Sequence, residues 1–127
     1  MSSIDKLVIG GAQFGLPNYG ITNTNVELNR DEIKKIFNTA NDFKISYVDT
    51  ARDYGISEQI IGENFECNES EIKILTKLST LDNCDEECDH ELVRQSVFKS
   101  IETSKRLLKR PLDCLMLHRA DHFWRWN

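Results

Sequence analysis

Four short apolar runs, separated by helical or polar stretches, constrain the fold of this 127-residue chain more than any other feature. The runs lie at residues 7–9, 45–48, 72–75 and 112–117. Short apolar runs without strict alternation of polar residues are typical of parallel strands, which are buried on both faces. Helices between such strands imply right-handed βαβ crossovers. The sequence therefore predicts an α/β fold with about four βα units and parallel strands.

Three amphipathic segments fit the intervals between these runs. The first follows Asn29, a favourable N-cap with Glu32 three residues later. Its predicted buried face is Ile33, Ile36, Phe37 and Ala40. A second helix is predicted from Ser57, taken as its N-cap, to about Phe65, and a third over residues 90–109. The predicted inward stripe of the third helix is Val93, Val97, Ile101, Ser104 and Leu108.

Polar residues mark the C-terminal ends of three of the strands. Asp49 ends the second strand, and Tyr54 follows it in the next loop. Lys77 ends the third strand and His118 ends the fourth. In parallel α/β folds the loops at this edge converge on one crevice. A strand-ending Asp often caps a helix and a single His often serves packing, but four such residues together predict a functional site.

The segments that carry these residues resemble the aldo-keto reductase family. Residues 49–62, DTARDYGISEQIIG, closely resemble the family signature D-T-A-x-x-Y-G-x-S-E-x-x-I-G. ILTK at 74–77 and LMLH at 115–118 look like the family's third and fourth strands with their lysine and histidine. GGAQFG at 10–15 is similar to the G-T-A-Q-F-G opening of one bacterial branch. The resemblance implies a partial (β/α)8 TIM barrel, with residues 1–127 as its N-terminal half and the C-terminal half absent.

The resemblance also implies an activity, the reduction of an aldehyde or ketone to an alcohol with hydride from NADPH. By resemblance Tyr54 donates the proton, and Lys77 beside it lowers the pKa of the hydroxyl, which is about 10 in free tyrosine. Asp49 is expected to pair with Lys77, and His118 to donate a hydrogen bond to the substrate carbonyl. Glu58 is interpreted as structural, because a carboxylate in the first turn of a helix favours the macrodipole. The opening motif favours sugar-related or small aldehyde substrates.

The resemblance places most NADPH contacts in strands five to eight of the barrel. A barrel of this type takes about 250 residues, so a chain of 127 residues lacks them. The residues expected to touch the cofactor are Gly10, Gly11, Ala12, Gln13 and Asp49. Gly11 stands where the family usually has threonine. We therefore expect that this chain alone binds no dinucleotide measurably.

Composition argues against several other classes of function. The net charge of −5 and the scattered basic residues disfavour a nucleic-acid partner or a membrane surface, and no apolar stretch has the length of a membrane span. The N-terminus lacks the pattern of a signal peptide, which predicts a cytoplasmic protein with reduced thiols. Cys84 and Cys88 form a C-x3-C pair near His90, but no second ligand pair follows, so no metal is expected. Cys114 is predicted to be a small core residue.

Two other interpretations stay open. A doubly wound dinucleotide-binding domain would fit the glycines that end at Gly15, but their spacing is not G-x-G-x-x-G, and a polar loop at 18–29 follows them. A non-catalytic half-barrel interaction module would use the strand edges and the apolar inner face that half a barrel exposes. The same surfaces predict self-association. Trp124 and Trp126 are candidates for lining a substrate pocket.

Overall fold

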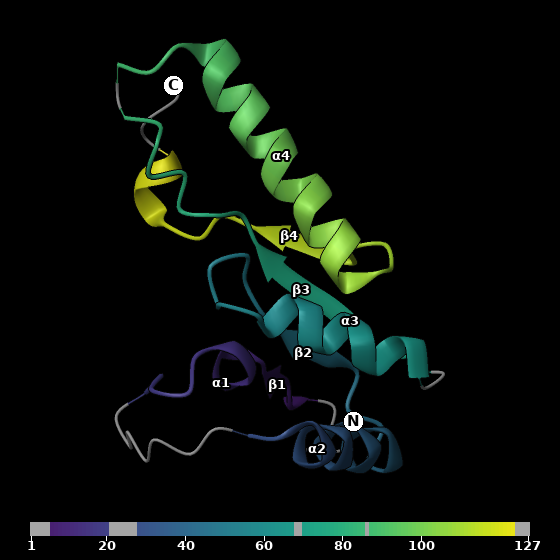
Figure 1. Cartoon of the computed structure of the whole chain (residues 1–127). Helices are drawn as coiled ribbons and strands as arrows, with labels where there is room; N and C mark the ends of the chain where they lie inside the picture. Colours follow the sequence, from purple (N-terminus) through teal and green to yellow (C-terminus); the bar gives the residue numbers. More distant parts are fainter. Residues whose placement is uncertain (1–5, 21–27, 68–69, 86, 124–127) are drawn as a thin grey trace.

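The described residues form one sheet of four parallel strands in the order β1-β2-β3-β4 (Figure 1). The structure, a computed structural model, describes residues 6–20, 28–67, 70–85 and 87–123. The strands are β1 (Ile9–Gly10), β2 (Tyr47–Asp49), β3 (Lys73–Lys77) and β4 (Cys114–Met116). Each strand overlaps a predicted run, and all four are parallel as predicted.

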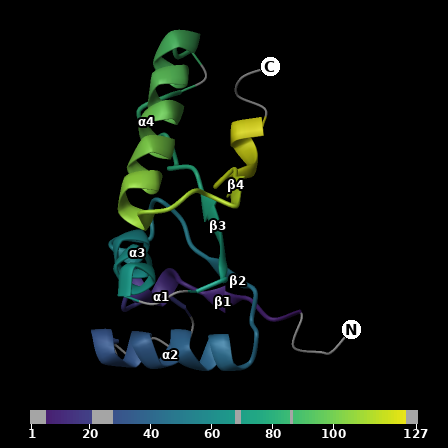
Figure 2. The same ribbon diagram turned by 90° about the vertical axis from the view of Figure 1, so that its right-hand side faces the viewer.

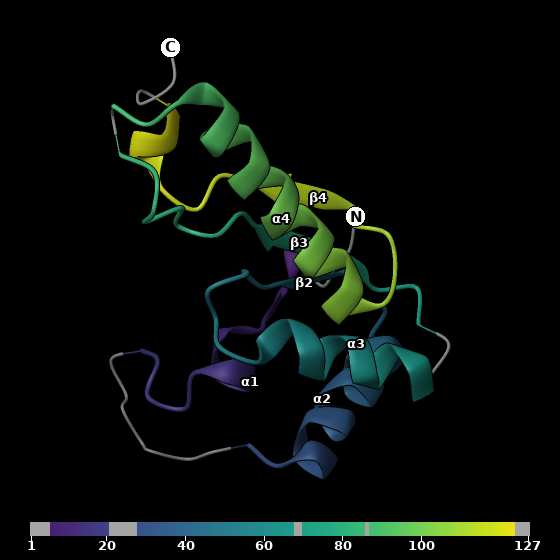
Figure 3. The same cartoon turned by 45° about the horizontal axis from the view of Figure 1, so that its top comes forward.

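Three long helices connect the strands, and two short ones lie near the loops. The helices are α1 (Ala12–Gly15), α2 (Arg30–Asp42), α3 (Ser57–Cys67), α4 (His90–Leu108) and the 3-10 helix η2 (Ala120–Phe123). The sequence predicted α2, α3 and α4 but neither short helix. Helix α3 packs against both α2 and α4 (Figure 3). Among the described residues, no helix combines the length and apolar character needed to cross a membrane.

The strand order distinguishes a barrel segment from a doubly wound sheet. Figure 2 shows α3 and α4 on the same side of the strands, and residues of α2 join the same buried core. A doubly wound sheet reverses its strand order near β1 and carries helices on both faces. Sequential order with helices on one face is the arrangement of a (β/α)8 barrel. The doubly wound interpretation is therefore wrong, and the chain has the α/β fold of a partial barrel.

Helix α2 begins after the predicted N-cap Asn29, which forms a reciprocal capping box with Glu32. The Glu32 backbone N–H donates to Asn29 Oδ1 at 3.0 Å, and the Asn29 N–H donates to Glu32 Oε2 at 2.9 Å. Asp31 and Glu32 also place negative charge in the first turn, where the helix dipole favours it. The buried residues of this helix are Ile33, Phe37 and Ala40, while Ile36 is half-buried.

Ser57 does not cap α3 as predicted. It is the first helical residue, and its hydroxyl donates to the Gly11 carbonyl at 2.7 Å. The Ser57 hydroxyl also lies 2.8 Å from Thr50 Oγ1, and both side chains are fully buried. The serine therefore joins the turn after β1 to the end of β2, a contact between positions 46 residues apart in the sequence.

The two faces of the sheet differ in what covers them. We call the helix-packed side the covered face: Val48 and Ile74 lie side by side there, and with Thr76 they are fully buried. The opposite side, which we call the open face, carries Leu75 and its neighbour Cys114. Cys114 is exposed, so its prediction as a core residue is wrong. The reason is that it lies on an edge strand, on the face without helices.

Candidate active site

The structure brings all four predicted catalytic residues together at the C-terminal end of the sheet. Asp49 ends β2, Lys77 ends β3, Tyr54 lies in the loop after β2, and His118 follows β4. The Lys77 ammonium donates to Asp49 Oδ1 at 2.7 Å and to the Thr50 carbonyl at 3.0 Å. It also lies 5.1 Å from the centre of the Tyr54 ring. Lysine and tyrosine are thus close enough for the charge of one to act on the other.

His118 completes the cluster from the neighbouring strand. Its ring stands edge-on to the Tyr54 ring, with centres 5.7 Å apart and planes at 87°. Its Nδ1 atom lies 3.2 Å from the Leu78 carbonyl oxygen and 3.6 Å from Asp53 Oδ2. The histidine is therefore held by the loops that follow both β2 and β3.

The pKa of Tyr54 lies above the ordinary value for tyrosine. Burial of the hydroxyl is the largest cause, and the nearby Lys77 ammonium opposes it by favouring the phenolate. Tyr19, whose ring centre lies 5.7 Å away, raises the pKa further through its charge and a hydrogen bond. Lys77 does lower the pKa of Tyr54, as expected. The expected net lowering is wrong, because burial and Tyr19 together raise this pKa by more than Lys77 lowers it. Tyr54 consequently keeps its proton near neutral pH.

Two glycines position the loop that carries Tyr54. A Cβ atom added to Gly15 would lie 1.9 Å from the Tyr54 carbonyl oxygen, and one added to Gly55 would lie 2.3 Å from the Gly15 carbonyl oxygen. Gly55 also has a positive φ of 55°, which glycine adopts without strain. The end of α1 and the Tyr54 loop can approach this closely only because neither residue has a side chain.

A buried ion pair between Arg52 and Glu58 holds the loop that carries Tyr54 in place. Glu58 is 1% exposed, pairs with Arg52 and accepts a hydrogen bond from Thr76 Oγ1 at 2.7 Å. Glu58 lies in the first turn of α3, as interpreted from the sequence, but its carboxylate does more than favour the helix dipole. It ties the Tyr54 loop to β3, the strand that carries Lys77. Removing one partner of such a pair leaves a buried charge without compensation.

Gly11, in the turn after β1, packs directly against the end of β2. The Gly11 N–H donates to the Asp49 carbonyl at 2.7 Å, and the Gly11 carbonyl accepts from Ser57. A Cβ atom on Gly11 would lie 2.8 Å from the Asp49 carbonyl oxygen, too close for the threonine usual in the family. Gly11 and Ala12 are buried, whereas Gly10 and Gln13 are exposed. Of residues 10–13 only Gly10 and Gln13 are therefore exposed to solvent, and Gly10 lies opposite Asp49 in the pairing of β1 with β2.

A comparison with models of known protein families identifies the family of this chain. The model of the Aldo/keto reductase family matches residues 6–125. The chain belongs to the aldo/keto reductase family. The match spans the first strand, the Tyr54 loop and the ends of β3 and β4. A comparison with curated protein sequences finds no significant match.

Solved structures share the fold at low sequence identity. A protein of Pseudomonas aeruginosa assigned to the aldo-keto reductases has a TM-score of 0.66 and 20% identity, over 89% of this chain and 42% of its own. An aldo-keto reductase from Bacillus halodurans in its holo form has a TM-score of 0.60 and 18% identity, over 88% of this chain and 35% of its own. A protein assigned as a 2,5-diketo-D-gluconic acid reductase B gives 0.56 and 22%, over 87% and 32%. This aldo/keto reductase chain thus spans less than half the length of these proteins.

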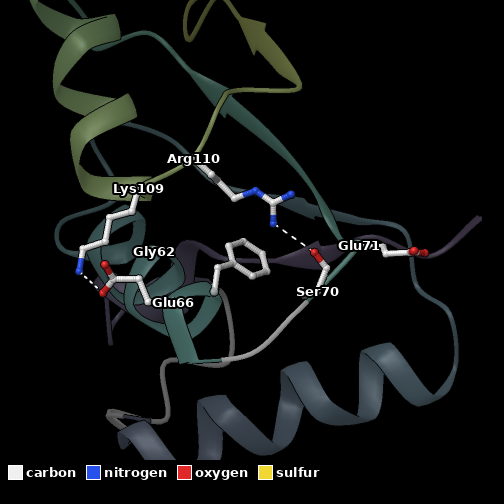
Figure 4. Close-up of a pocket in the computed structure, with 7 residues that line it drawn as sticks. Gly62, Glu66, Ser70, Glu71, Lys109 and Arg110 are labelled. Atoms are coloured by element: carbon white, nitrogen blue, oxygen red, sulfur yellow. Dashed lines mark hydrogen bonds and ion pairs between the residues drawn. The ribbon is translucent and has the colours of Figure 1, made fainter.

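A hollow of about 540 Å³ lies at the opposite end of the sheet from the Tyr54 cluster, at the N-terminal ends of β3 and β4 (Figure 4). Three of the charged residues that line it, Glu66, Lys109 and Arg110, have partners within the chain. Lys109 pairs with Glu66, while Arg110 donates to the Ser70 carbonyl at 3.2 Å and lies over the Phe65 ring. In barrels of this type that end serves stability, and sites form at the other end. The Tyr54 cluster, at the C-terminal ends of the strands, is therefore the candidate site of this aldo/keto reductase chain.

Sequence reasoning missed two residues beside this cluster. Asp53, which directly precedes Tyr54, falls at an unspecified position of the family signature. Tyr19 lies in a stretch that was interpreted only as a polar loop. Among the described residues, no group of three or more His, Cys, Asp or Glu side chains is placed to hold a metal ion. Trp124 and Trp126 lie outside the described residues.

Proposed function

We propose that this site reduces an aldehyde or ketone to the alcohol with NADPH as hydride donor. The proposed catalytic residues are Asp49, Tyr54, Lys77 and His118. The observation that carries the proposal is the contact of Lys77 with both Asp49, at 2.7 Å, and the Tyr54 ring, at 5.1 Å. A reduced nicotinamide bound at this edge of the sheet would supply the hydride to the carbonyl carbon.

The proton that completes the reaction comes from Tyr54 in this proposal. Its hydroxyl proton moves to the carbonyl oxygen as that oxygen gains negative charge, which leaves an alcohol and a tyrosine phenolate. The hydroxyl carries this proton at neutral pH, but its raised pKa makes it a weaker donor than free tyrosine, so the step depends on stabilisation of the phenolate. Lys77 stabilises the phenolate that forms, and Asp49 holds the Lys77 ammonium in place. His118 donates a hydrogen bond that orients the carbonyl.

The turn after β1 fits one part of the cofactor. Nothing lies within 4 Å of the position where a Gly10 side chain would begin, so a ligand can approach the backbone there. Asp49 lies opposite Gly10 in the pairing of β1 with β2, and Gln13 is exposed three residues farther along, whereas the backbone groups of Gly11 are used within the protein. We infer that Gly10 to Gln13, with Asp49, hold part of the NADPH, and that these residues alone bind it too weakly for binding to be measured directly.

We favour a sugar-related or small aldehyde as substrate. GGAQFG at 10–15 resembles the opening motif of a bacterial branch, and one structural neighbour is named for 2,5-diketo-D-gluconic acid. A cytoplasmic setting suits the chain, since Cys84, Cys88 and Cys114 are thiols rather than members of disulfides.

The test is carbonyl-dependent consumption of NADPH by the purified chain at high cofactor concentration, over a panel of aldehydes and ketones. Tyr54→Phe is expected to lower turnover roughly 100- to 10,000-fold, the usual contribution of a positioned proton donor. Tyr47→Phe is the matched control, because Tyr47 lies in β2 below the site and contacts Lys73 instead. Turnover that survives in Tyr54→Phe would contradict the role of Tyr54.

The second candidate is a non-catalytic half-barrel interaction module. The observation that favours it is the exposure of apolar side chains at the edges of the sheet, such as Val8 at 47%. This candidate predicts that the wild-type chain has no turnover even at saturating carbonyl and NADPH. That result would overturn the reductase proposal for this chain.

A further inference from the structure

The last two residues of β3 present their side chains to opposite faces of the sheet, as neighbours in a strand do. Thr76 is fully buried on the covered face, whereas Lys77 reaches Asp49 on the open face. The partner of Thr76 on the covered face is Glu58 of α3, whose Oε1 atom accepts a hydrogen bond from the threonine hydroxyl at 2.7 Å. A contact on the covered face is therefore made one residue away from the catalytic lysine.

The two oxygens of the Glu58 carboxylate bind different segments of the chain. Oε1 accepts from Thr76 of β3, and Oε2 accepts from the guanidinium of Arg52, in the loop after β2. Because Glu58 is 1% exposed, both contacts lie in a medium of low dielectric constant, which strengthens them. One buried carboxylate thus joins the residue before Lys77 to a residue two positions before Tyr54.

The backbone pairing between this loop and β3 stops short of Tyr54. The Arg52 N–H donates to the Lys77 carbonyl at 3.1 Å. Among the described residues, no later N–H of the loop bonds to the β3 backbone, and the Tyr54 N–H donates to Ala51 within the loop at 3.2 Å. Beyond Arg52, the placement of the loop relative to β3 therefore depends on side chains.

The other contacts of the loop reach different segments. Gly55 packs closely against Gly15 at the end of α1, and Asp53 accepts the backbone N–H of Thr80, in the loop after β3. Neither contact involves the strand residue beside the lysine. Glu58 is the side chain that connects the loop to that residue.

We propose that Glu58 is a positioning residue for proton transfer, because it holds the Tyr54 loop against the end of β3. Its contacts with Arg52 and Thr76 set how closely the tyrosine hydroxyl approaches the Lys77 ammonium. That approach determines how strongly the ammonium stabilises the phenolate, since the interaction of two charges weakens with distance. The inference rests on the proposed function, which takes Tyr54 as the proton donor.

The test is to separate Glu58 from β3 while its ion pair with Arg52 stays intact. Thr76→Val does so, since valine has nearly the shape of threonine but no hydroxyl to donate. Thr76→Ser is the matched control, because it keeps the hydroxyl and loses only a methyl group. Glu58→Gln is less informative, since it leaves the Arg52 charge without its partner and destabilises the fold.

The readout is the effect of Lys77 on the pKa of Tyr54. In wild type, Thr76→Val and Thr76→Ser, this pKa is measured by tyrosinate absorbance with Lys77 present and with Lys77→Met. The rise caused by Lys77→Met should be smaller in Thr76→Val than in wild type, and unchanged in Thr76→Ser. Taking the difference within each chain cancels the effects of burial and of the other titratable groups that face Tyr54, which are Tyr19, Asp49 and His118.

Turnover gives a second measurement where the chain reduces a carbonyl. Thr76→Val should lower kcat by up to about 100-fold, the cost of a small misplacement of reacting groups, while KM stays within about twofold. Thr76→Ser should keep the wild-type kcat, and circular dichroism checks that each variant is folded.

Two results would overturn the proposal: an effect of Lys77 in Thr76→Val as large as in wild type, or an equal reduction in Thr76→Ser. The titration needs neither cofactor nor turnover, so its outcome is distinguishable from failure of the proposed function. A chain that reduces no carbonyl but loses the Lys77 effect in Thr76→Val alone would contradict the reductase and support the role of Glu58 in placing the loop.

Discussion

The covered and open faces of the sheet are built from the same strands but have opposite properties. On the covered face, Val48 and Ile74 are fully buried against the helices. On the open face, Cys114 is exposed, and Asp49 and Lys77 meet at the strand ends. The Tyr54 cluster is thus supported from the covered side and accessible from the open side. Packing on one face of the sheet holds in place the side chains that are presented on the other.

The largest difference between the faces is expected in stability. Val48→Ala removes two buried methyl groups and leaves a cavity, which should lower the free energy of unfolding by about 2 to 3 kcal/mol. Val8→Ala is the matched change at a side chain that is 47% exposed, and it should change the free energy by less than about 0.5 kcal/mol. Urea denaturation measures both. Equal losses would show that Val8 is covered in solution.

A smaller difference is expected between two neighbouring glycines. Gly11→Ala would place a Cβ atom 2.8 Å from the Asp49 carbonyl oxygen, so we expect a loss of about 1 to 3 kcal/mol. Gly10→Ala meets nothing within 4 Å and should cost less than about 0.5 kcal/mol. Thermal unfolding of the two variants measures the difference. A neutral Gly11→Ala would mean that the turn moves away from β2 easily.

The open face is also expected to associate with a second copy of the chain. A charged side chain at an exposed edge disfavours strand pairing, so Cys114→Lys should weaken self-association about tenfold, or by about 1.4 kcal/mol. Asn38→Lys adds the same charge at an exposed position on α2 and should have little effect. Sedimentation velocity over a concentration series measures both variants. A wild-type chain that stays monomeric at every concentration would contradict this prediction.

The smallest effect concerns the titration of Tyr54. Tyr19→Phe removes a hydrogen bond that raises the pKa of Tyr54, so the pKa of the variant should fall. Lys77→Met removes the cation that lowers it, so that pKa should rise. The measurement is tyrosinate absorbance against pH. For each variant, the titration curve of the same variant carrying Tyr54→Phe is subtracted, so that the difference reports the Tyr54 hydroxyl alone. If the pKa of Tyr54 shifted in the same direction in both variants, the cause would be a change in the burial of its hydroxyl and not the loss of the Tyr19 or Lys77 contact.

The raised pKa also links Tyr54 to stability at high pH. A group whose pKa is higher in the folded state holds its proton more tightly there than in the unfolded chain. Its contribution is therefore complete below the unfolded value of about 10 and is lost as the pH rises through the folded value.

Much of the fold and of the site was predictable, because both depend on local patterns. The apolar runs located all four strands, and Asn29 with Glu32 predicted the start of α2 through contacts three residues apart. Lys77 was predictable as a site residue because parallel strands place their C-terminal ends at one edge. Ser57 was assigned the wrong role, since its partner Gly11 lies 46 residues away.

The sequence by itself determined the alternation of strands and helices, the family and the identity of the four clustered residues. These follow from spacing and side-chain type, which are fixed along the chain. Only the tertiary structure decided that Cys114 is exposed, that burial outweighs Lys77 at the Tyr54 hydroxyl, and that Asp53 lies against His118. Exposure, pKa and hydrogen-bond partners depend on which distant segments pack together, and neither periodicity nor a motif specifies that packing.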